Sequence, residues 1–277
     1  MSKFTLAYSP CPNDTFIFYA MMHQKVFCEN FLFDVIHADV ERLNQAARQG
    51  TYDITKLSFH AVGHLLDHYA ILKTGAALGY NCGPLIVAQK GCDLSVLENH
   101  TIAVPGTWTT ANLLLGLYLQ KNPNVRPMSF ETIMPAIQQK KHMAGVIIHE
   151  GRFTYQQYGL TCLLDLGQWW ENETGLPVPL GCIALKRDLS HLHHLIEQCM
   201  MNSLDYSRQN PEKAAEYIKQ HAQETSNDVI RQHIDLYVND DTRSLSQTGK
   251  RAIETLFKRA RNFGLIPNFE GDLFFDT

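Results

Sequence analysis

The sequence predicts an α/β fold made of two units with a cleft between them. Segments rich in β-forming residues alternate with amphipathic helical segments, a pattern typical of a mostly parallel sheet with helices on both faces. The alternation restarts near residue 89, and a proline-rich segment, 176–181, precedes a strand that returns to the first unit. We therefore expect a discontinuous domain 1 over 1–88 and 183–277, which includes the C-terminal helices, and an inserted smaller domain 2 over 89–182.

The first unit begins with an alternating strand over 3–8. The loop 9–14 ends that strand because two prolines interrupt it, and Asn13 or Asp14 can cap a helix over 15–23. The further elements expected in this unit are a strand 31–37, a helix 40–48, a strand 52–57, a helix 59–68 capped by Ser58, and strands within 70–78 and 83–88.

The second unit repeats the pattern with shorter elements. We expect a strand 101–104, a helix 110–120, a helix 129–141 despite Pro135, and a strand 144–148. After a strand over 182–185 the chain is helical, with helices expected over 189–209, 211–221, 228–238 and 246–262. Pro211 suits the first turn of its helix, and Gly264 ends the last one.

The composition is that of an ordinary globular protein, with 277 residues, 45% of them hydrophobic, and a formal net charge of −4. Because Lys and Arg number 24 against 28 Asp and Glu, no basic face for nucleic acid is indicated. The longest apolar stretch, 16–22, is far shorter than the roughly 20 residues of a membrane span. Pro10 and Pro12 interrupt any secretory pattern. We expect a cytoplasmic protein without nucleic-acid or membrane partners.

The common site signatures are missing from the sequence. It holds no GxGxxG after a strand, no GxxxxGK[ST], no HExxH and no GxSxG. The seven cysteines form no CxxC pair, so we expect reduced thiols. The chemistry must then rest on polar residues at the carboxyl ends of strands, where open α/β sheets bind ligands.

His149 follows an apolar strand and is the first candidate for catalysis. An ordinary imidazole is largely neutral at cytoplasmic pH and can accept a proton, and Glu150 or Arg152 could tune it. The alternative is a surface histidine in a turn.

Three junctions are candidates for substrate binding. In the segment 106–112, hydroxyls and free helix amides around Thr109 and Thr110 suit a carboxylate or phosphate, although a plain threonine cap is the alternative. Lys56 and Ser58 offer an ammonium and a hydroxyl, or else a solvated lysine and a structural cap. Asn13 and Asp14 can either cap a helix or point into the cleft.

His60, His64 and His68 are spaced four residues apart, on one face of the predicted helix. Two of these imidazoles could hold zinc or nickel, which would favour a metal-dependent hydrolase. No fourth ligand is indicated by spacing, and the other residues of the helix form a core face. We therefore expect these histidines to line the polar side of the helix and expect no metal site.

Four segments together carry a family resemblance. They are the octapeptide SPCPNDTF at 9–16, GTWTTA at 106–111, HEGRFTY at 149–155 and GLPVPLG at 175–181. In this order they resemble the 1,4-dihydroxy-6-naphthoate synthases of the futalosine route to menaquinone. The similarity runs from about residue 3 to about residue 265.

The resemblance implies a two-lobed periplasmic-binding-protein type II fold used as a cytoplasmic enzyme, without metal or organic cofactor. It implies a carbon–carbon lyase that converts cyclic dehypoxanthinyl futalosine into 1,4-dihydroxy-6-naphthoate and dihydroxyacetone. The family's proton acceptor falls on His149. The family's substrate contacts fall on two segments, which are Lys56, Leu57 and Ser58 in the first and Thr109 and Thr110 in the second. Leu57 can offer only backbone or apolar contact.

Two other functions remain open at this stage. Chorismate dehydratase of the same pathway shares the architecture, but the octapeptide favours the later step. A non-catalytic protein of this fold that binds a small carboxylate would normally be exported, which the N-terminus does not indicate. In each case the partner is a small molecule bearing a carboxylate, and a homodimer is left open.

Overall fold

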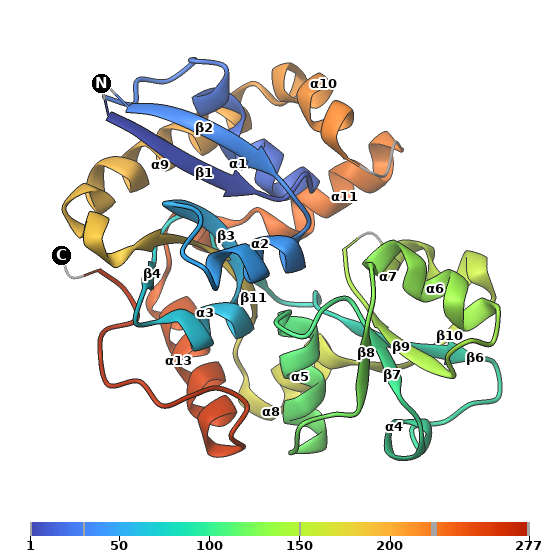
Figure 1. Cartoon of the computed structure of the whole chain (residues 1–277). Helices are drawn as coiled ribbons and strands as arrows, with labels where there is room; N and C mark the ends of the chain where they lie inside the picture. Colours follow the sequence, from blue (N-terminus) through green and yellow to red (C-terminus); the bar gives the residue numbers. More distant parts are fainter. Residues whose placement is uncertain (1, 30, 150, 223–225, 276–277) are drawn as a thin grey trace.

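The computed structural model describes residues 2–29, 31–149, 151–222 and 226–275, which form two sheets (Figure 1). In the first sheet the strand order is β2-β1-β3-β11-β4, and β5 also pairs with β11. β1 is parallel to β2 and β3, whereas β11 is antiparallel to β3, β4 and β5. The strands are β1 Ser2–Tyr8, β2 Phe31–His37, β3 Ile54–Ser58, β4 Tyr69–Ile71, β5 Ala77–Gly79 and β11 Val178–Lys186.

Helices cover both faces of the first sheet. On one face α1 contacts α9, α10 and α11, and on the other α2 packs on β3 and α3 contacts β3, β4 and β11 (Figure 1). The helices of this part are α1 Pro12–Met22, α2 Val40–Ala47, α3 Phe59–Leu65, η2 Arg187–Leu192, α9 His193–Gln209, α10 Pro211–His221, α11 Asn227–Tyr237, α12 Asp240–Arg243 and α13 Gln247–Asn262.

The second sheet has the order β10-β6-β9-β7-β8. β7 is parallel to β8 and β9, and β6 runs antiparallel between β9 and β10. Its strands are β6 Leu85–Gln89, β7 Ile102–Val104, β8 Val125–Pro127, β9 Ala144–Ile147 and β10 Leu160–Asp165. Its helices are α4 Val96–Asn99, α5 Thr110–Leu119, α6 Phe130–Gln138, α7 Gly151–Thr154, η1 Tyr155–Tyr158 and α8 Leu166–Thr174.

Both sheets are mixed rather than mostly parallel, and two segments pair differently from the sequence expectation. The strand expected over 83–88 in domain 1 is β6 of the second sheet, and the proline-rich 178–181 is part of β11 in the first sheet. Strand partners are set by long-range backbone hydrogen bonds, which local composition does not encode. We propose that the two units join through 80–84 and 175–177, the segments between these sheets.

The first helix begins three residues earlier than expected. Cys11 occupies the N-cap position without a side-chain cap bond, and Pro12 fills the first turn, where its missing N–H costs nothing. Asn13 and Asp14 therefore lie inside the first turn and are buried rather than acting as caps. Their side chains are available for contacts elsewhere.

The cysteines also differ from the expectation of reduced thiols. Cys28 and Cys199 form a disulfide with a Cα–Cα distance of 5.2 Å, and the other cysteines are not in disulfides. The partners are 171 residues apart, so their spacing in the sequence gives no sign of the pairing.

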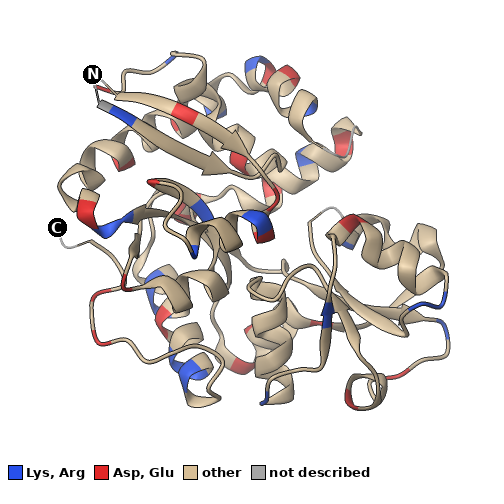
Figure 2. Cartoon of the chain, viewed as in Figure 1, with Lys and Arg blue, Asp and Glu red and all other residues tan. Residues whose placement is uncertain are grey.

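Charged side chains of both signs are interspersed over both parts of the molecule (Figure 2). No helix in the described ranges is long and apolar enough to cross a membrane.

One hydrophobic cluster spans the two sheets. It includes Leu57 of β3, Ile86 of β6, Leu114 of α5 and Phe257 of α13, all fully buried. The rings of Phe59 and Phe257 meet edge to face, with centroids 6.2 Å apart. This shared core holds the start of α5, with Thr109 and Thr110, near the end of β3, with Lys56 and Ser58.

Candidate active site

A cavity lies between the two sheets and holds about 660 Å³ of unoccupied space, part of it open to solvent. This size is within the range of small-molecule sites. All the residues expected at the site except Leu57 line it: Asn13, Asp14, Lys56, Ser58, Thr109, Thr110 and His149. The rest of the wall is Ser9, Val40, Ala77, Gly83, Pro84, Ala111, Ile148, Leu180, Gly181, His233 and Tyr237.

Strand alternation explains why Leu57 differs from its neighbours. Successive side chains of a strand point to opposite faces, so Lys56 and Ser58 face the cavity while Leu57 is fully buried in the shared core. Opposite this strand, Gly181 of β11 leaves room for the lysine. A Cβ at residue 181 would lie 2.8 Å from the Leu57 carbonyl oxygen and 3.2 Å from the Lys56 Cε.

Lys56 and Asp14 form a buried ion pair at the base of the cavity. The distance from Lys56 Nζ to Asp14 Oδ1 is 2.5 Å, and both side chains are buried. Burying two charges is costly unless further hydrogen bonds satisfy them. Here Ser9 Oγ donates to Asp14 Oδ2 over 2.6 Å and the Asn13 amide donates to Asp14 Oδ1 over 2.8 Å. The carboxylate is thereby fixed in place.

This pair orients a histidine that the sequence analysis missed. Since Asp14 accepts from the amide nitrogen of Asn13, the amide oxygen must point the other way, and it lies 3.0 Å from Nε2 of His233. Nε2 therefore carries the proton in this contact. Burial lowers the pKa of His233 well below its usual value, and His149 and Lys56 lower it further. His233 is thus a neutral imidazole in the cavity wall.

The sequence offered one clue to His233, which is its position among apolar residues of the helix α11. It lies beside Ile234 and four residues before Tyr237, on a side of the helix that also buries Ile230. A histidine among buried residues resembles a core position, and only the tertiary structure places it at the cavity.

His149 follows β9 and precedes α7. Its φ is 54°, in the left-handed region that non-glycine residues rarely adopt. Its Nδ1 is 3.5 Å from the sulfur of Cys11, and the ring of Phe130 meets it edge to face with centroids 5.0 Å apart. The His233 ring lies nearly parallel to it, with centroids 6.3 Å apart. Two imidazoles from different parts of the molecule therefore border the same space.

Arg152, which was expected to tune His149, has its partners elsewhere. Arg152 donates to the Gly83 carbonyl over 2.7 Å and pairs with Asp165 over 3.0 Å, so it ties α7 to the start of β6 and to β10. Glu150 lies outside the described residues. Cys11, which the sequence analysis did not include in the site, is one of the side chains in contact with the His149 ring.

The threonines at the start of α5 have partners within the chain. Thr109 caps the helix by accepting from the Asn112 N–H over 3.3 Å, and its hydroxyl donates to the Gly106 carbonyl. The Thr110 hydroxyl donates to the carbonyl of Leu180 in β11 over 2.6 Å. Both threonines line the cavity, and the Thr110 bond joins the second unit to the first sheet.

A carboxylate of the chain itself lies at the turn before α5. Glu41 of α2 accepts from the N–H of Trp108 over 3.3 Å and from the hydroxyl of Thr107 over 3.3 Å. Burial raises the pKa of Glu41, although bonds from Gln45 and Asn44 act in the opposite direction. Two groups of the segment 106–112, where an anion site was expected, are therefore used to attach α2 to this turn.

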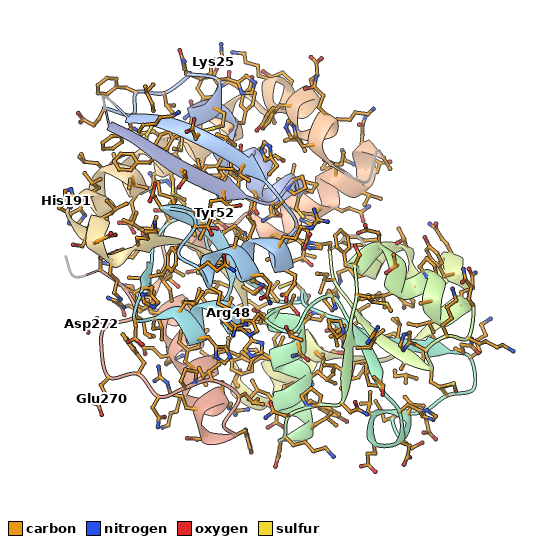
Figure 3. All side chains as sticks on the ribbon, in the orientation of Figure 1. Lys25, Arg48, Tyr52, His191, Glu270 and Asp272 are labelled. Atoms are coloured by element: carbon orange, nitrogen blue, oxygen red, sulfur yellow. A yellow bond between two sulfur atoms is a disulfide. The ribbon has the colours of Figure 1, made fainter. Side chains whose placement is uncertain are left out.

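Asn44 and Arg48 also face this junction. The Asn44 amide donates to Ser58 Oγ over 3.1 Å and to the Trp108 carbonyl over 3.2 Å, which orients the serine. Arg48, labelled in Figure 3, lies over the ring of Trp108 at 5.3 Å from its centroid.

The three histidines spaced four residues apart were expected to line the polar side of their helix, but His60 is buried, and the centroid of its ring lies 5.2 Å from that of His64. The His60 nitrogens lie 3.2 Å from the Thr109 carbonyl and 3.4 Å from the Leu265 carbonyl, and burial lowers its pKa to about 4. His64 stacks on Trp108 with centroids 4.9 Å apart. His68 lies beyond the end of α3. Within the described ranges, no three His, Cys, Asp or Glu side chains are grouped to hold a metal ion.

Sequence comparisons match nearly the whole chain to proteins of menaquinone biosynthesis. A family model described as menaquinone biosynthesis matches residues 4–262. A Thermus thermophilus protein named 1,4-dihydroxy-6-naphtoate synthase is 44% identical over 266 residues, which cover 96% of each chain. A Streptomyces coelicolor protein of the same name is 41% identical over 269 residues, which cover 95% of this chain and 94% of the relative.

Solved structures show the same fold. A crystal structure of an Archaeoglobus fulgidus protein has a TM-score of 0.88 at 37% identity, covering 95% of this chain and 98% of that chain. The alkanesulfonate-binding protein of Xanthomonas axonopodis pv. citri, solved with MOPS, has a TM-score of 0.71 at 12% identity. The match covers 97% of this chain and 95% of that chain. The fold is therefore of the periplasmic-binding-protein type.

Proposed function

Because the chain belongs to the menaquinone biosynthesis family, we propose that it converts cyclic dehypoxanthinyl futalosine into 1,4-dihydroxy-6-naphthoate and dihydroxyacetone. It is an enzyme of that pathway, and the reaction assigned here is that of a carbon–carbon lyase. Two relatives above 40% identity carry the corresponding name. The observation that carries the proposal is His149 at a cavity whose wall offers both a fixed ammonium and apolar surface.

In the proposed reaction His149 is the general base. A neutral imidazole removes a proton beside the substrate ketone, and the spiro bond to the sugar opens by elimination. Carbon–carbon cleavage follows and is drawn forward because the product is an aromatic diol. The contact with Cys11 and the ring of Phe130 hold the imidazole against the cavity. The steps are proton transfers and bond cleavages with no change of oxidation state that would require an external electron carrier.

The substrate carboxylate is assigned to the polar side of the cavity. The Lys56 ammonium has three donors, of which the Asp14 contact uses one, so it can bind a second carboxylate. Ser58 lines the same side, and because its oxygen accepts from Asn44 its hydroxyl proton can be donated to the carboxylate. The Thr109 and Thr110 hydroxyls donate to main-chain carbonyls, so their oxygens are left to accept from hydroxyl groups of the substrate. Asn13 and Asp14 act by holding the lysine in place.

The apolar wall is assigned to the aromatic ring. It is formed by Ala77, Pro84, Ala111, Ile148, Leu180 and Tyr237. Burial of a ring against these side chains excludes water from the reacting atoms and strengthens the electrostatic contacts of the base and the ammonium.

The test is turnover of cyclic dehypoxanthinyl futalosine by purified protein, followed by mass detection of the naphthoate. We expect the wild-type protein and a His100→Ala control, altered at an exposed histidine, to form the product. His149→Ala should lose a factor of about 10² to 10⁴ in kcat, which is the usual contribution of a general base. Wild-type activity in His149→Ala would refute the base. Turnover of chorismate instead would favour the dehydratase.

A further inference from the structure

A second cavity adjoins the first on the other side of His149. It holds about 730 Å³ of unoccupied space, and we call it the outer cavity; its wall consists of Pro10, Cys11, Asp39, Val40, Arg42, Ser129, Phe130, Glu131 and His149. Val40 and His149 belong to the walls of both cavities. The imidazole therefore stands where the two spaces meet.

We propose that the outer cavity binds the polyhydroxylated, sugar-derived part of the substrate, while the first cavity binds its aromatic carboxylate part. The proposal rests on the proposed function and adds to it a subsite for the fragment that leaves.

The side chains of the two cavities differ, and each set suits one of the two parts of the substrate. The first cavity combines an ammonium with mostly apolar side chains, which suits a flat ring bearing a carboxylate. The outer cavity presents the carboxylates of Asp39 and Glu131, the guanidinium of Arg42 and the hydroxyl of Ser129. These groups include both donors and acceptors, as neutral hydroxyl groups need.

Several of these groups keep hydrogen-bonding capacity. The side chains of Ser129 and Glu131 make no hydrogen bond or ion pair within the described ranges. Arg42 uses Nε for Asp39, at 3.3 Å, and its other guanidinium nitrogens make no hydrogen bond or ion pair within the described part of the chain. Asp39 is committed to the start of α2, since one oxygen accepts from the N–H groups of Glu41 and Arg42. Ser129, Glu131 and Arg42 are therefore the groups available to a ligand.

The position of His149 fits a substrate that spans both spaces. The bond that breaks joins the aromatic part to the sugar-derived part, so it must lie where the two subsites meet, and the imidazole lies there. Phe130 offers an apolar edge beside the imidazole, against which the C–H face of a sugar can pack. After cleavage the small polar fragment is on the side of the outer cavity and can leave while the ring remains bound.

The test compares the substrate with the naphthoate product, which lacks the sugar-derived part. The double variant Ser129→Ala with Glu131→Ala and the single variant Arg42→Ala are assayed for KM with cyclic dehypoxanthinyl futalosine. Binding of 1,4-dihydroxy-6-naphthoate is measured by calorimetry. Glu98→Ala, altered at an exposed carboxylate of α4 in the same unit, is the matched control.

We expect KM to rise about tenfold in the outer-cavity variants, as one or two lost hydrogen bonds produce, while the Kd of the naphthoate stays within about twofold. The control should change neither. Turnover with an unchanged KM, or equal weakening of substrate and product, would overturn the subsite but leave the proposed function standing. A wild-type protein that neither turns over the substrate nor binds the naphthoate would overturn both.

Discussion

His149 and His233 meet the same cavity with different surroundings. His149 lies in a turn between β9 and α7, in contact with Cys11, whereas His233 is buried in α11 and fixed by Asn13. The N–H of the neutral His233 ring donates to the Asn13 side-chain oxygen, so a substitution keeps this hydrogen bond only if the new side chain also carries a donor. Variants with and without such a donor therefore test the contact.

His233→Leu should lower the free energy of unfolding by about 1–3 kcal/mol, because the buried oxygen of Asn13 loses its donor. His233→Gln can return an N–H to the same oxygen and should lose less. Urea unfolding of the two variants measures the difference. Equal stabilities of the leucine and glutamine variants would show that the hydrogen bond to Asn13 contributes nothing.

His60 predicts how stability depends on pH. Its pKa in the folded protein is lowered to about 4 by burial, below the usual 6.5, so the unfolded chain binds the proton more readily. Stability from this group is full above pH 6.5 and falls as the pH drops toward 4, by on the order of 3 kcal/mol. Denaturation at a series of pH values should show the slope in the wild type.

The slope should be smaller in His60→Gln, because glutamine does not titrate. The exposed His100→Gln serves as the control and should keep the slope of the wild type. A His60→Gln protein with an unchanged slope would mean that other groups set the pH dependence.

At the scale of elements, the start of α5 depends on one hydroxyl. Thr109→Ala removes the acceptor of the Asn112 N–H and should cost about 0.5–2 kcal/mol, as N-cap losses do. Thr109→Ser keeps the hydroxyl and should stay near the wild type. Thermal unfolding of both variants is the measurement, and loss of stability in the serine variant would point to the methyl group instead of the cap.

The elements themselves were predicted with uneven success. The strands β1 and β2 and the helices α2, α5, α10 and α13 agree with the patterns to within a residue or two, because apolar periodicity and capping act locally. The segments β8, β10, α4 and α8 were not foreseen, since their short runs have little periodicity of their own. Asn13 and Asp14 were expected either to cap the helix or to point into the cleft; Pro12 placed the helix start ahead of them, and both line the cavity.

At the scale of the whole molecule, Glu41 joins α2 of the first unit to the turn before α5 of the second. Glu41→Ala should therefore loosen the two sheets and increase the radius of gyration of the unliganded protein in X-ray scattering. Gln45→Ala is the matched control, since Gln45 lies on the same helix and only donates to Glu41. Identical scattering from wild type and Glu41→Ala would show that other contacts hold the units together.

The sequence alone determined the junctions of strands and helices that border the cavity. The strand-to-helix junction placed Lys56 and Ser58, the cap signal placed Thr109, and the end of an apolar run placed His149, because each of these depends on neighbours within a few residues. Only the tertiary structure decided the partners of these groups. The contacts of Asn13 with His233, 220 residues away, and of Glu41 with Trp108 follow from how two sheets and their helices pack, and no local pattern records that packing.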